Sequence, residues 1–338
     1  MKRFVCLLFV FILAIPLVFA GGNTDRAIRG NITIYTSMYE DVIENVNHHL
    51  QRRFPRCNVE FVYGGTGRIK NMISVEKNTG RLGCDILMVA EPAYTLELKE
   101  MGLLHSYMSR EAVNLAFEFD REGYWYPVRI NNMVLAYNPA RTPRNSVPNS
   151  FYDFAHDSRV REAISMRNPA VSGTSLATLT ALRDKYGYEY FTALGRQQLR
   201  IEYGTAGSLS KLESGEYKAI MILEESILQK REQENSSLEI IYPTDGTVMI
   251  PSTIMIVNNR WSKNRNTRAA EVITDWFLSE EGQNAIVAGW MHSVRIDHPR
   301  IPNGSRPISE IRANSIQVDL EENYRQRDEV LSRFEGRN

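Results

Sequence analysis

Cysteine is scarce in this sequence, and its charge is balanced. Three cysteines occur in 338 residues, and 40 basic side chains match 40 acidic ones, so the formal net charge is zero. Three cysteines cannot make the dense disulfide framework of small secreted domains. A neutral chain lacks the basic excess of a nucleic-acid binder, so no nucleic-acid partner is expected. With 43% hydrophobic residues, the chain has the composition of an ordinary folded protein and is long enough for two domains.

Long hydrophobic runs are absent after residue 20. Residues 1–20 begin with Lys2 and Arg3 and continue with an apolar stretch that ends in small residues, which is the pattern of a cleavable secretory signal. The stretch is too short for a stable membrane anchor. A lipoprotein would carry cysteine directly after the cleavage point, whereas Cys6 lies inside the apolar stretch. We therefore expect a soluble, exported, periplasmic protein that is cleaved before Gly21.

Export leaves two cysteines in the mature chain, Cys57 and Cys84. An oxidising compartment permits a disulfide between them. Each cysteine begins a predicted strand, so a bridge is geometrically reasonable, but two buried free thiols fit the sequence equally well.

Catalytic motifs are missing as well. The six histidines form no His-x-x-x-His pair, and no Gly-x-Ser-x-Gly sequence occurs. We therefore expect a protein that is not an enzyme and has neither a metal site nor a cofactor. A Ser-His-Asp triad can also be assembled from distant residues, so an exported phosphate-ester hydrolase stays an alternative.

Strands and helices alternate along the first hundred residues. Strands are predicted at 31–36, 58–63 and 84–90, and helices at 43–54, 68–77 and 93–101. This order and spacing indicate a doubly wound parallel sheet. Ligands of such sheets bind beyond the carboxyl ends of the strands, where Thr36, Ser37, residues 64–66 and Glu91 are found.

Two extended segments set this unit apart from a second α/β unit. Residues 126–138 and 250–257 are predicted to cross between two lobes, because both are long and rich in strand-forming residues. In the second unit a strand is predicted at 219–223, and the remainder of the chain is predicted to be helical at 267–278, 280–288 and 319–334. We assign residues 21–130 and 255–338 to lobe 1, and residues 131–254 to lobe 2.

Residues 168–175 read Asn-Pro-Ala-Val-Ser-Gly-Thr-Ser and open a predicted helix. Pro169 excludes helix just before it. Ser172 is a favourable N-cap, and Gly173 lets the backbone approach another group closely. Free N–H groups and three hydroxyls converge at this helix start, which suits a small anion. A capped helix that binds nothing has the same sequence signature.

Short motifs spread over nearly all of the mature chain resemble one protein family. They are similar to type II periplasmic solute-binding proteins of ABC importers, in the branch that binds ferric iron, phosphonates and sugar phosphates. The motifs include Ile34-Tyr35-Thr36-Ser37, Val89-Ala90-Glu91, Leu135-Ala136-Tyr137-Asn138, Asn168-Pro169-Ala170-Val171-Ser172-Gly173-Thr174 and Tyr242-Pro243-Thr244-Asp245-Gly246-Thr247.

The resemblance implies an α/β fold of two lobes, each a mostly parallel sheet flanked by helices, with the ligand cleft between them. The lobes would close on a small anionic solute, and an ABC permease in the inner membrane would recognise the closed form. The protein is expected to be a monomer.

The phosphonate and sugar-phosphate binders are the members that this chain resembles most. Carried over by position, the resemblance assigns the anion pocket to Thr36, Ser37, Thr66, Ser172, Gly173 and Thr174. Glu224 or Glu225 would hold the polar far end of the ligand, and Ser208 and Asp245 are weaker candidates. Asp245 also fits a turn cap next to Gly246. Arg129 lies on a crossing segment and could reach a phosphate, but a structural salt bridge at the hinge is the more frequent use of such an arginine.

Ferric iron is the alternative ligand. The iron-binding members carry two adjacent tyrosines after the strand that follows a Gly-Glu-Tyr-like motif, and this chain has Leu223-Glu224-Glu225 there. Phenolates are hard oxygen donors that suit ferric iron, so their absence at this position disfavours iron, although carboxylates can also bind metal. The three tyrosines within residues 186–190 are expected to pack in the core.

Overall fold

The computed structural model describes residues 28–296, 298–316 and 318–337. The secretory signal predicted at residues 1–20, with Cys6, lies outside these residues. Within the described ranges, no helix is both long and apolar enough to cross a membrane.

The described residues form ten strands and twelve α-helices. The strands are β1 (Gly30–Thr36), β2 (Cys57–Tyr63), β3 (Ile86–Val89), β4 (Tyr126–Tyr137), β5 (Ile164–Arg167), β6 (Arg200–Glu202), β7 (Ala219–Leu223), β8 (Glu239–Ile241), β9 (Thr247–Ile256) and β10 (Ser315–Ile316). The helices are α1 (Glu40–Arg53), α2 (Thr66–Asn78), α3 (Pro92–Glu100), α4 (Phe151–His156), α5 (Gly173–Tyr186), α6 (Glu189–Arg196), α7 (Thr205–Ser214), α8 (Glu224–Glu234), α9 (Thr267–Leu278), α10 (Glu280–Ala288), α11 (Ile308–Ala313) and α12 (Leu320–Glu335).

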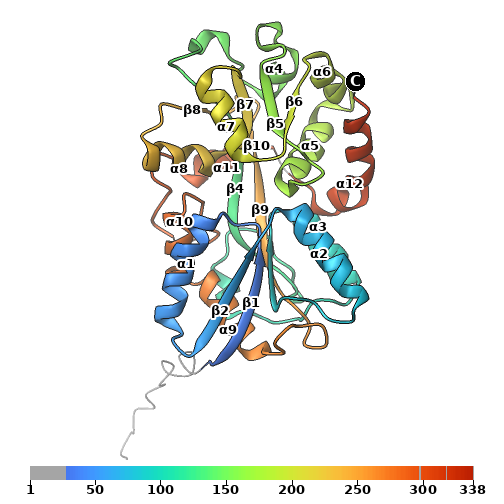
Figure 1. The fold of residues 1–338 in the computed structure, drawn as a ribbon, viewed down its shortest axis with the longest axis vertical. Helices are drawn as coiled ribbons and strands as arrows, with labels where there is room; N and C mark the ends of the chain where they lie inside the picture. Colours follow the sequence, from blue (N-terminus) through green and yellow to red (C-terminus); the bar gives the residue numbers. More distant parts are fainter. Residues whose placement is uncertain (1–27, 297, 317, 338) are drawn as a thin grey trace, which may run out of the picture.

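The strands join into one sheet with two mostly parallel ends. The strand order is β2-β1-β3-β9-β4-β7-β5-β6. Strand β1 runs parallel to β2 and β3, and β5 runs parallel to β6 and β7. The long strands β4 and β9 pair antiparallel in the middle and run from one end of the molecule to the other (Figure 1). They are the two crossing segments expected from the sequence, and the predicted α/β class is confirmed.

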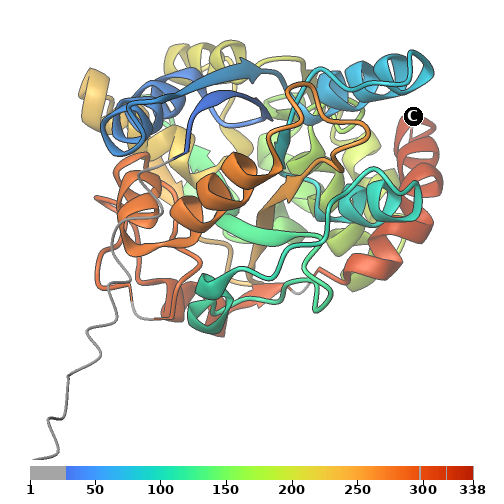
Figure 2. The ribbon, with the colours of Figure 1, turned by 90° about the horizontal axis from the view of Figure 1, so that it is seen from below.

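Helices cover both faces of each end of the sheet. At the lower end in Figure 1, α1, α9 and α10 pack on one face and α2 and α3 on the other, and Figure 2 shows the same arrangement from below. At the upper end, α4, α5 and α6 cover one face and α7 and α8 the other. Every residue of β4 is buried, because this strand pairs with β7 and β9 and also contacts α5, α8 and α10.

The last helix, α12, contacts both α3 and α5 (Figure 1). Its Val330 and Phe334 are buried in the same core as α5. The division of the chain into lobes stays a prediction, and these contacts favour counting α12 with the second lobe rather than with residues 255–316.

The two cysteines of the described chain are free thiols. Cys57 begins β2, Cys84 precedes β3, and both are buried. Burial raises the pKa of both thiols, which keeps them protonated and chemically inert. Of the two possibilities left open by the sequence, the structure shows the unbridged one.

Candidate functional site

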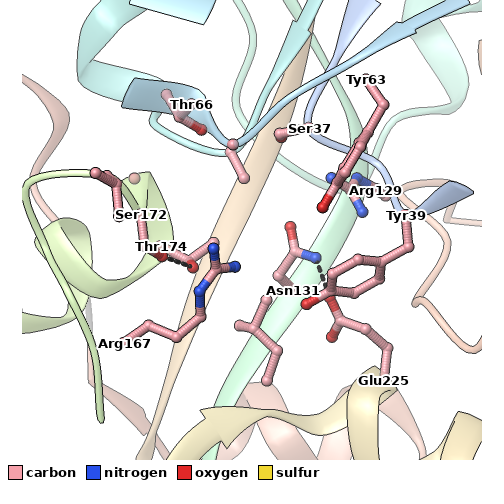
Figure 3. A pocket seen from close by; sticks show the side chains of 15 residues that line it. Ser37, Tyr39, Tyr63, Thr66, Arg129, Asn131, Arg167, Ser172, Thr174 and Glu225 are labelled. Carbon is pink, nitrogen blue, oxygen red and sulfur yellow. Dashed lines mark hydrogen bonds between the residues drawn. The ribbon is translucent and has the colours of Figure 1, made fainter. Parts of the chain in front are cut away.

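A polar cavity lies where the carboxyl ends of four parallel strands from both ends of the sheet meet (Figure 3). Ser37 follows β1, Tyr63 ends β2, Arg167 ends β5 and Leu223 ends β7, and all four residues line the cavity. Its empty volume is about 390 Å³, part of which is open to solvent. Six of the ten ligand-binding residues proposed from the sequence line it: Ser37, Thr66, Ser172, Gly173, Thr174 and Glu225.

The other four, Thr36, Ser208, Asp245 and Glu224, lie elsewhere. Thr36 is fully buried, and its hydroxyl accepts a hydrogen bond from the Met38 N–H at 3.0 Å. The Ser208 hydroxyl is buried against that of Ser165, at 3.0 Å. Asp245 accepts hydrogen bonds from two N–H groups at the start of α4, which makes it a helix cap rather than a cavity residue.

Glu224 points away from the cavity into a buried polar cluster. Its carboxylate accepts hydrogen bonds from Asn132 Nδ2 at 2.6 Å and Ser305 Oγ at 2.5 Å, and also from the Tyr242 hydroxyl. His292 Nε2 lies 3.1 Å from Glu224 Oε2. Burial favours the neutral acid, but these partners, His292 above all, hold the pKa of Glu224 below its usual value. Glu224 is therefore a structural carboxylate, and Glu225 is the one exposed to the cavity.

Four helices begin at the cavity. The N-cap residues of α1, α2, α5 and α8 are Tyr39, Gly65, Ser172 and Leu223, and all four line it. Ser172 caps its own helix, since its hydroxyl accepts a hydrogen bond from the Ser175 N–H at 3.3 Å. In the described structure the other three N-caps make no such side-chain bond. Apart from the Gly67 N–H of α2, which donates to the Val171 carbonyl, their first-turn N–H groups and the positive ends of three helix dipoles can face an anion.

Two arginines project into the cavity (Figure 3). Arg167 was not singled out from the sequence, and for Arg129 a salt bridge was preferred to a contact with phosphate. Arg129 on β4 is only 2% exposed. Its Nε has no hydrogen-bond partner, and its only side-chain hydrogen bond among the described residues is a weak one to the Met291 sulfur. The structural salt bridge expected for Arg129 is not formed within the described chain. Burial accordingly lowers its pKa.

Arg167 at the end of β5 is the second cationic group. Its Nε is also buried without a hydrogen-bond partner. Ser37 Oγ and Asn131 Oδ1 are likewise buried and unpartnered in the part of the chain that the structure describes. Buried polar atoms are normally satisfied, so four such atoms around one cavity indicate a site built to receive hydrogen-bonding groups from a ligand.

Glu225 carries a perturbed carboxyl group in the same cavity. Burial raises its pKa to about 7, and the charge of Arg129 limits the rise. Asn131 Nδ2 donates a hydrogen bond to Glu225 Oε1 at 2.5 Å. Near neutral pH this group is therefore divided between a neutral acid, which donates a hydrogen bond, and a carboxylate, which only accepts.

Tyr39 and Tyr63 bring two phenol groups to the cavity. The Tyr39 hydroxyl lies 3.2 Å from Ser226 Oγ, which joins the start of α1 to α8 on the opposite side. Burial raises the pKa of Tyr63. The described residues contain no group of three or more His, Cys, Asp or Glu side chains that could hold a metal ion.

Backbones from the two ends of the sheet touch beside the cavity. The Gly67 N–H donates a hydrogen bond to the Val171 carbonyl at 3.3 Å. A Cβ on Gly173 would lie 2.7 Å from Glu91 Cβ and 2.9 Å from the Ala90 carbonyl oxygen. These glycines allow a close approach that a side chain would prevent, so the structure shows the cavity in a closed arrangement.

Three comparisons with known proteins place this geometry in context. A family model described as bacterial extracellular solute-binding protein matches residues 84–307. An uncharacterized protein of Haemophilus influenzae is 21% identical over 268 residues, which cover 75% of each chain.

The fold matches those of solved structures in which a ligand is named. Iron-bound HitA from Pseudomonas aeruginosa has a TM-score of 0.78 at 20% identity and covers 91% of this chain and 99% of its own. The periplasmic binding protein AfuA from Actinobacillus pleuropneumoniae, with exogenous fructose-6-phosphate bound, has a TM-score of 0.78 at 18% identity and covers 90% and 97%. Both likenesses are of fold, and the two named ligands differ in charge.

Proposed function

The chain belongs to the bacterial extracellular solute-binding protein family, and from this we propose that it captures a small phosphate ester or phosphonate in the cleft. In the proposal the protein is exported to the periplasm, works as a monomer, and delivers the solute to an ABC permease in the inner membrane. Its partners are the solute and the permease, without nucleic acid.

The observation that carries this proposal is the buried, unpaired guanidinium of Arg129. A buried charge is costly unless an opposite charge and hydrogen bonds compensate it. Among the described residues Arg129 has no ion pair and only the hydrogen bond to the Met291 sulfur, while the charge of Glu225 acts on it within the cavity. Arg167 has neither a hydrogen bond nor an ion pair among them. An anion between them would supply the missing charge, and the free N–H groups at three helix starts would share it.

The hydroxyl groups of the cavity complete the proposed anion pocket. Ser37 and Thr66 lie on one side, and Ser172 and Thr174 on the other (Figure 3). Each charge-assisted hydrogen bond contributes about 1.5–3 kcal/mol, so the loss of one of them weakens binding by about tenfold to hundredfold. Glu225 and Asn131 would hold the hydroxyl groups of the carbon skeleton.

Carriage rather than hydrolysis is supported by what lines the cavity. Among the described residues that line it, none is histidine, and the carboxyl group present, Glu225, is hydrogen-bonded by Asn131. The Ser172 hydroxyl is hydrogen-bonded to the Thr174 hydroxyl and to the N–H and hydroxyl of Ser175, rather than to a group that could act as its general base. The serine hydroxyls therefore serve best as hydrogen-bond donors to the solute.

Ferric iron is the second candidate, because two phenols and one carboxyl group meet in this cavity. Tyr39, Tyr63 and Glu225 are oxygen ligands of the type that ferric iron prefers. Two guanidinium groups in the same small space oppose a bare cation, so iron would need an accompanying anion.

The test compares the binding of a phosphate ester with that of the same sugar without its phosphate. Fructose 6-phosphate should bind in titration calorimetry and fructose should not, and Ser172→Ala/Thr174→Ala should weaken the ester at least tenfold. Thr192→Ala/Ser210→Ala, at two exposed helix positions, is the matched control and should bind normally. Unchanged affinity in the first double variant would refute the anion assignment. Visible colour and tight binding with a ferric salt alone would favour iron instead.

A further inference from the structure

A second cavity adjoins the first one at its side. Gly65, Arg167, Val171, Ser172 and Gly173 line both cavities, so the two share one wall. The second cavity, here called the outer cavity, has an empty volume of about 1110 Å³, against about 390 Å³ for the inner one. It extends from this wall to α12, which contributes Arg327, Asp328 and Leu331.

Two features form the shared wall: a backbone hydrogen bond between Gly67 and Val171, and the side chain of Arg167. The Gly67–Val171 hydrogen bond closes the wall between the backbones. Arg167 makes neither a hydrogen bond nor an ion pair with any residue in the described ranges, and its Nε is buried. Its guanidinium group is thus available to both cavities and can shift without losing a bond.

Basic side chains dominate the outer cavity. Lys70 is paired with Glu91 at 3.0 Å, and Arg327 with Glu97 at 2.5 Å. Arg68, at the start of α2, has no hydrogen bond or ion pair in the described part of the chain. Four basic side chains thus line the outer cavity against two acidic ones, Glu91 and Asp328. Asp328 lies 3.5 Å from Arg327, and Arg68 and Arg167 are the basic groups of the lining that have no ion pair among the described residues.

Apolar side chains form the remaining wall of the outer cavity. Leu176 of α5 and Leu331 of α12 line it, together with the ring of Tyr203, which is 73% exposed. A carbon skeleton could pack against this surface while its charged end contacts Arg68. A single phosphate needs only the inner cavity, so the outer one has room for a further part of the solute.

We propose that the natural solute is a phosphate ester with a second anionic group. The first phosphate occupies the inner cavity, the second group binds Arg68 and Lys70 in the outer cavity, and Arg167 lies between the two. This inference rests on the proposed function and adds the class of substrate to it.

The test uses fructose 6-phosphate and fructose 1,6-bisphosphate as probes for calorimetry on the full mature protein. The bisphosphate should bind at least about tenfold tighter, since one more charge-assisted contact is worth about that factor. Arg68→Ala should remove most of this advantage while the affinity for the monophosphate changes less than twofold, and Arg68→Glu should reverse it. Arg121→Ala removes the same charge at an exposed position outside both cavities and should alter neither affinity.

The outcomes separate this inference from the proposed function. Equal affinities for the two esters, or an equal loss for both in Arg68→Ala, would overturn the second anion site and leave the first one standing. Failure of both esters to bind would overturn the proposed function and this inference together. Thermal unfolding of each variant shows whether a loss of affinity comes from a loss of folded protein.

Discussion

Replacing Arg129 by methionine should make the unliganded protein more stable and the solute bind more weakly. Methionine keeps much of the length of the arginine side chain and removes its charge and its hydrogen-bond donors. In the wild-type protein this guanidinium is 2% exposed, has an unpartnered Nε and has no ion pair within the described residues. The two effects have opposite signs because the same group is costly in the empty cavity and favourable in the occupied one.

The size of each effect follows from the contacts of Arg129. Replacing a poorly compensated buried ion by an apolar side chain of similar volume is often neutral or stabilises a protein by about 1–4 kcal/mol. Losing one charge-assisted contact to the solute costs about 1.5–3 kcal/mol, which is about a tenfold to hundredfold rise in Kd. Arg129 also limits the pKa of Glu225, so its removal raises that pKa further above about 7.

The assay is designed around this coupling to Glu225. At pH 6 the Glu225 carboxyl is mostly protonated with or without Arg129, so the comparison reports on the arginine alone. Urea unfolding gives the free energy of unfolding without solute, and calorimetry gives the Kd for fructose 6-phosphate. Arg129→Lys, which keeps the charge but not the planar fork, should recover part of the affinity. Arg121→Met is the control for the same exchange at an exposed position.

Two results would refute the reasoning about Arg129. A large loss of stability in Arg129→Met would mean that the guanidinium is compensated in the unliganded protein. Unchanged affinity would mean that the solute does not contact it. Either result, with normal behaviour of the Arg121→Met control, would remove the main support for an anionic solute.

Three further predictions concern single positions. Because the pKa of Glu225 is raised in the folded state, the free energy of unfolding should fall as pH rises from about 4.5 to about 7. Urea unfolding at several pH values should show a smaller fall for Glu225→Gln. An unchanged dependence on pH would assign the fall to another group. Gly173→Ala should keep the lobes apart, because its Cβ would lie 2.7 Å from Glu91 Cβ. With solute present, small-angle scattering should give this variant a larger radius of gyration than the control Gly207→Ala, whose added Cβ would have ordinary contacts. Equal radii for the two variants would contradict the prediction. Asp85→Ala should lower the free energy of unfolding by about 3 kcal/mol or more, because four buried or half-buried donors lose their acceptor; a loss below 1 kcal/mol would show that water replaces the carboxylate.

Much of the fold could be predicted because its signals are local. The helices at 267–278 and 280–288 and the strand at 219–223 have the periodicity or the apolar run expected of them, and the structure confirms their bounds. No bounds were predicted for helix α8, although residues 230–232 suggested a solvated helix face, because its sequence is polar along most of its length. Its start was visible in principle, since two glutamates directly after a strand favour the first turn of a helix.

The site was harder to predict, because its composition depends on contacts between distant segments. A hydroxyl-rich helix start is a local feature, so Ser172 and Thr174 could be selected from the sequence. The sequence could not decide between the two roles considered for Arg129, because an arginine on a crossing strand forms a salt bridge or faces a cavity according to what the other strands bring opposite it. Asn131 pairs with Glu225 only when β4 and α8 meet, a juxtaposition that spacing along the chain does not encode.

The electrostatics of the cavity explain how a bound anion could drive closure. In the closed arrangement Arg129, Arg167 and the positive ends of three uncapped helices converge from both ends of the sheet, so they repel one another when the cavity is empty. An anion attracts all of them at once, and it therefore binds the closed form more tightly than the open one. A ligand shifts an equilibrium only by this difference in affinity, and a change from 1% to 99% closed needs about 5.5 kcal/mol. Two arginines and several helix N–H groups, at about 1.5–3 kcal/mol for each charge-assisted bond, are sufficient for that shift, whereas an uncharged sugar of the same shape would lack most of it.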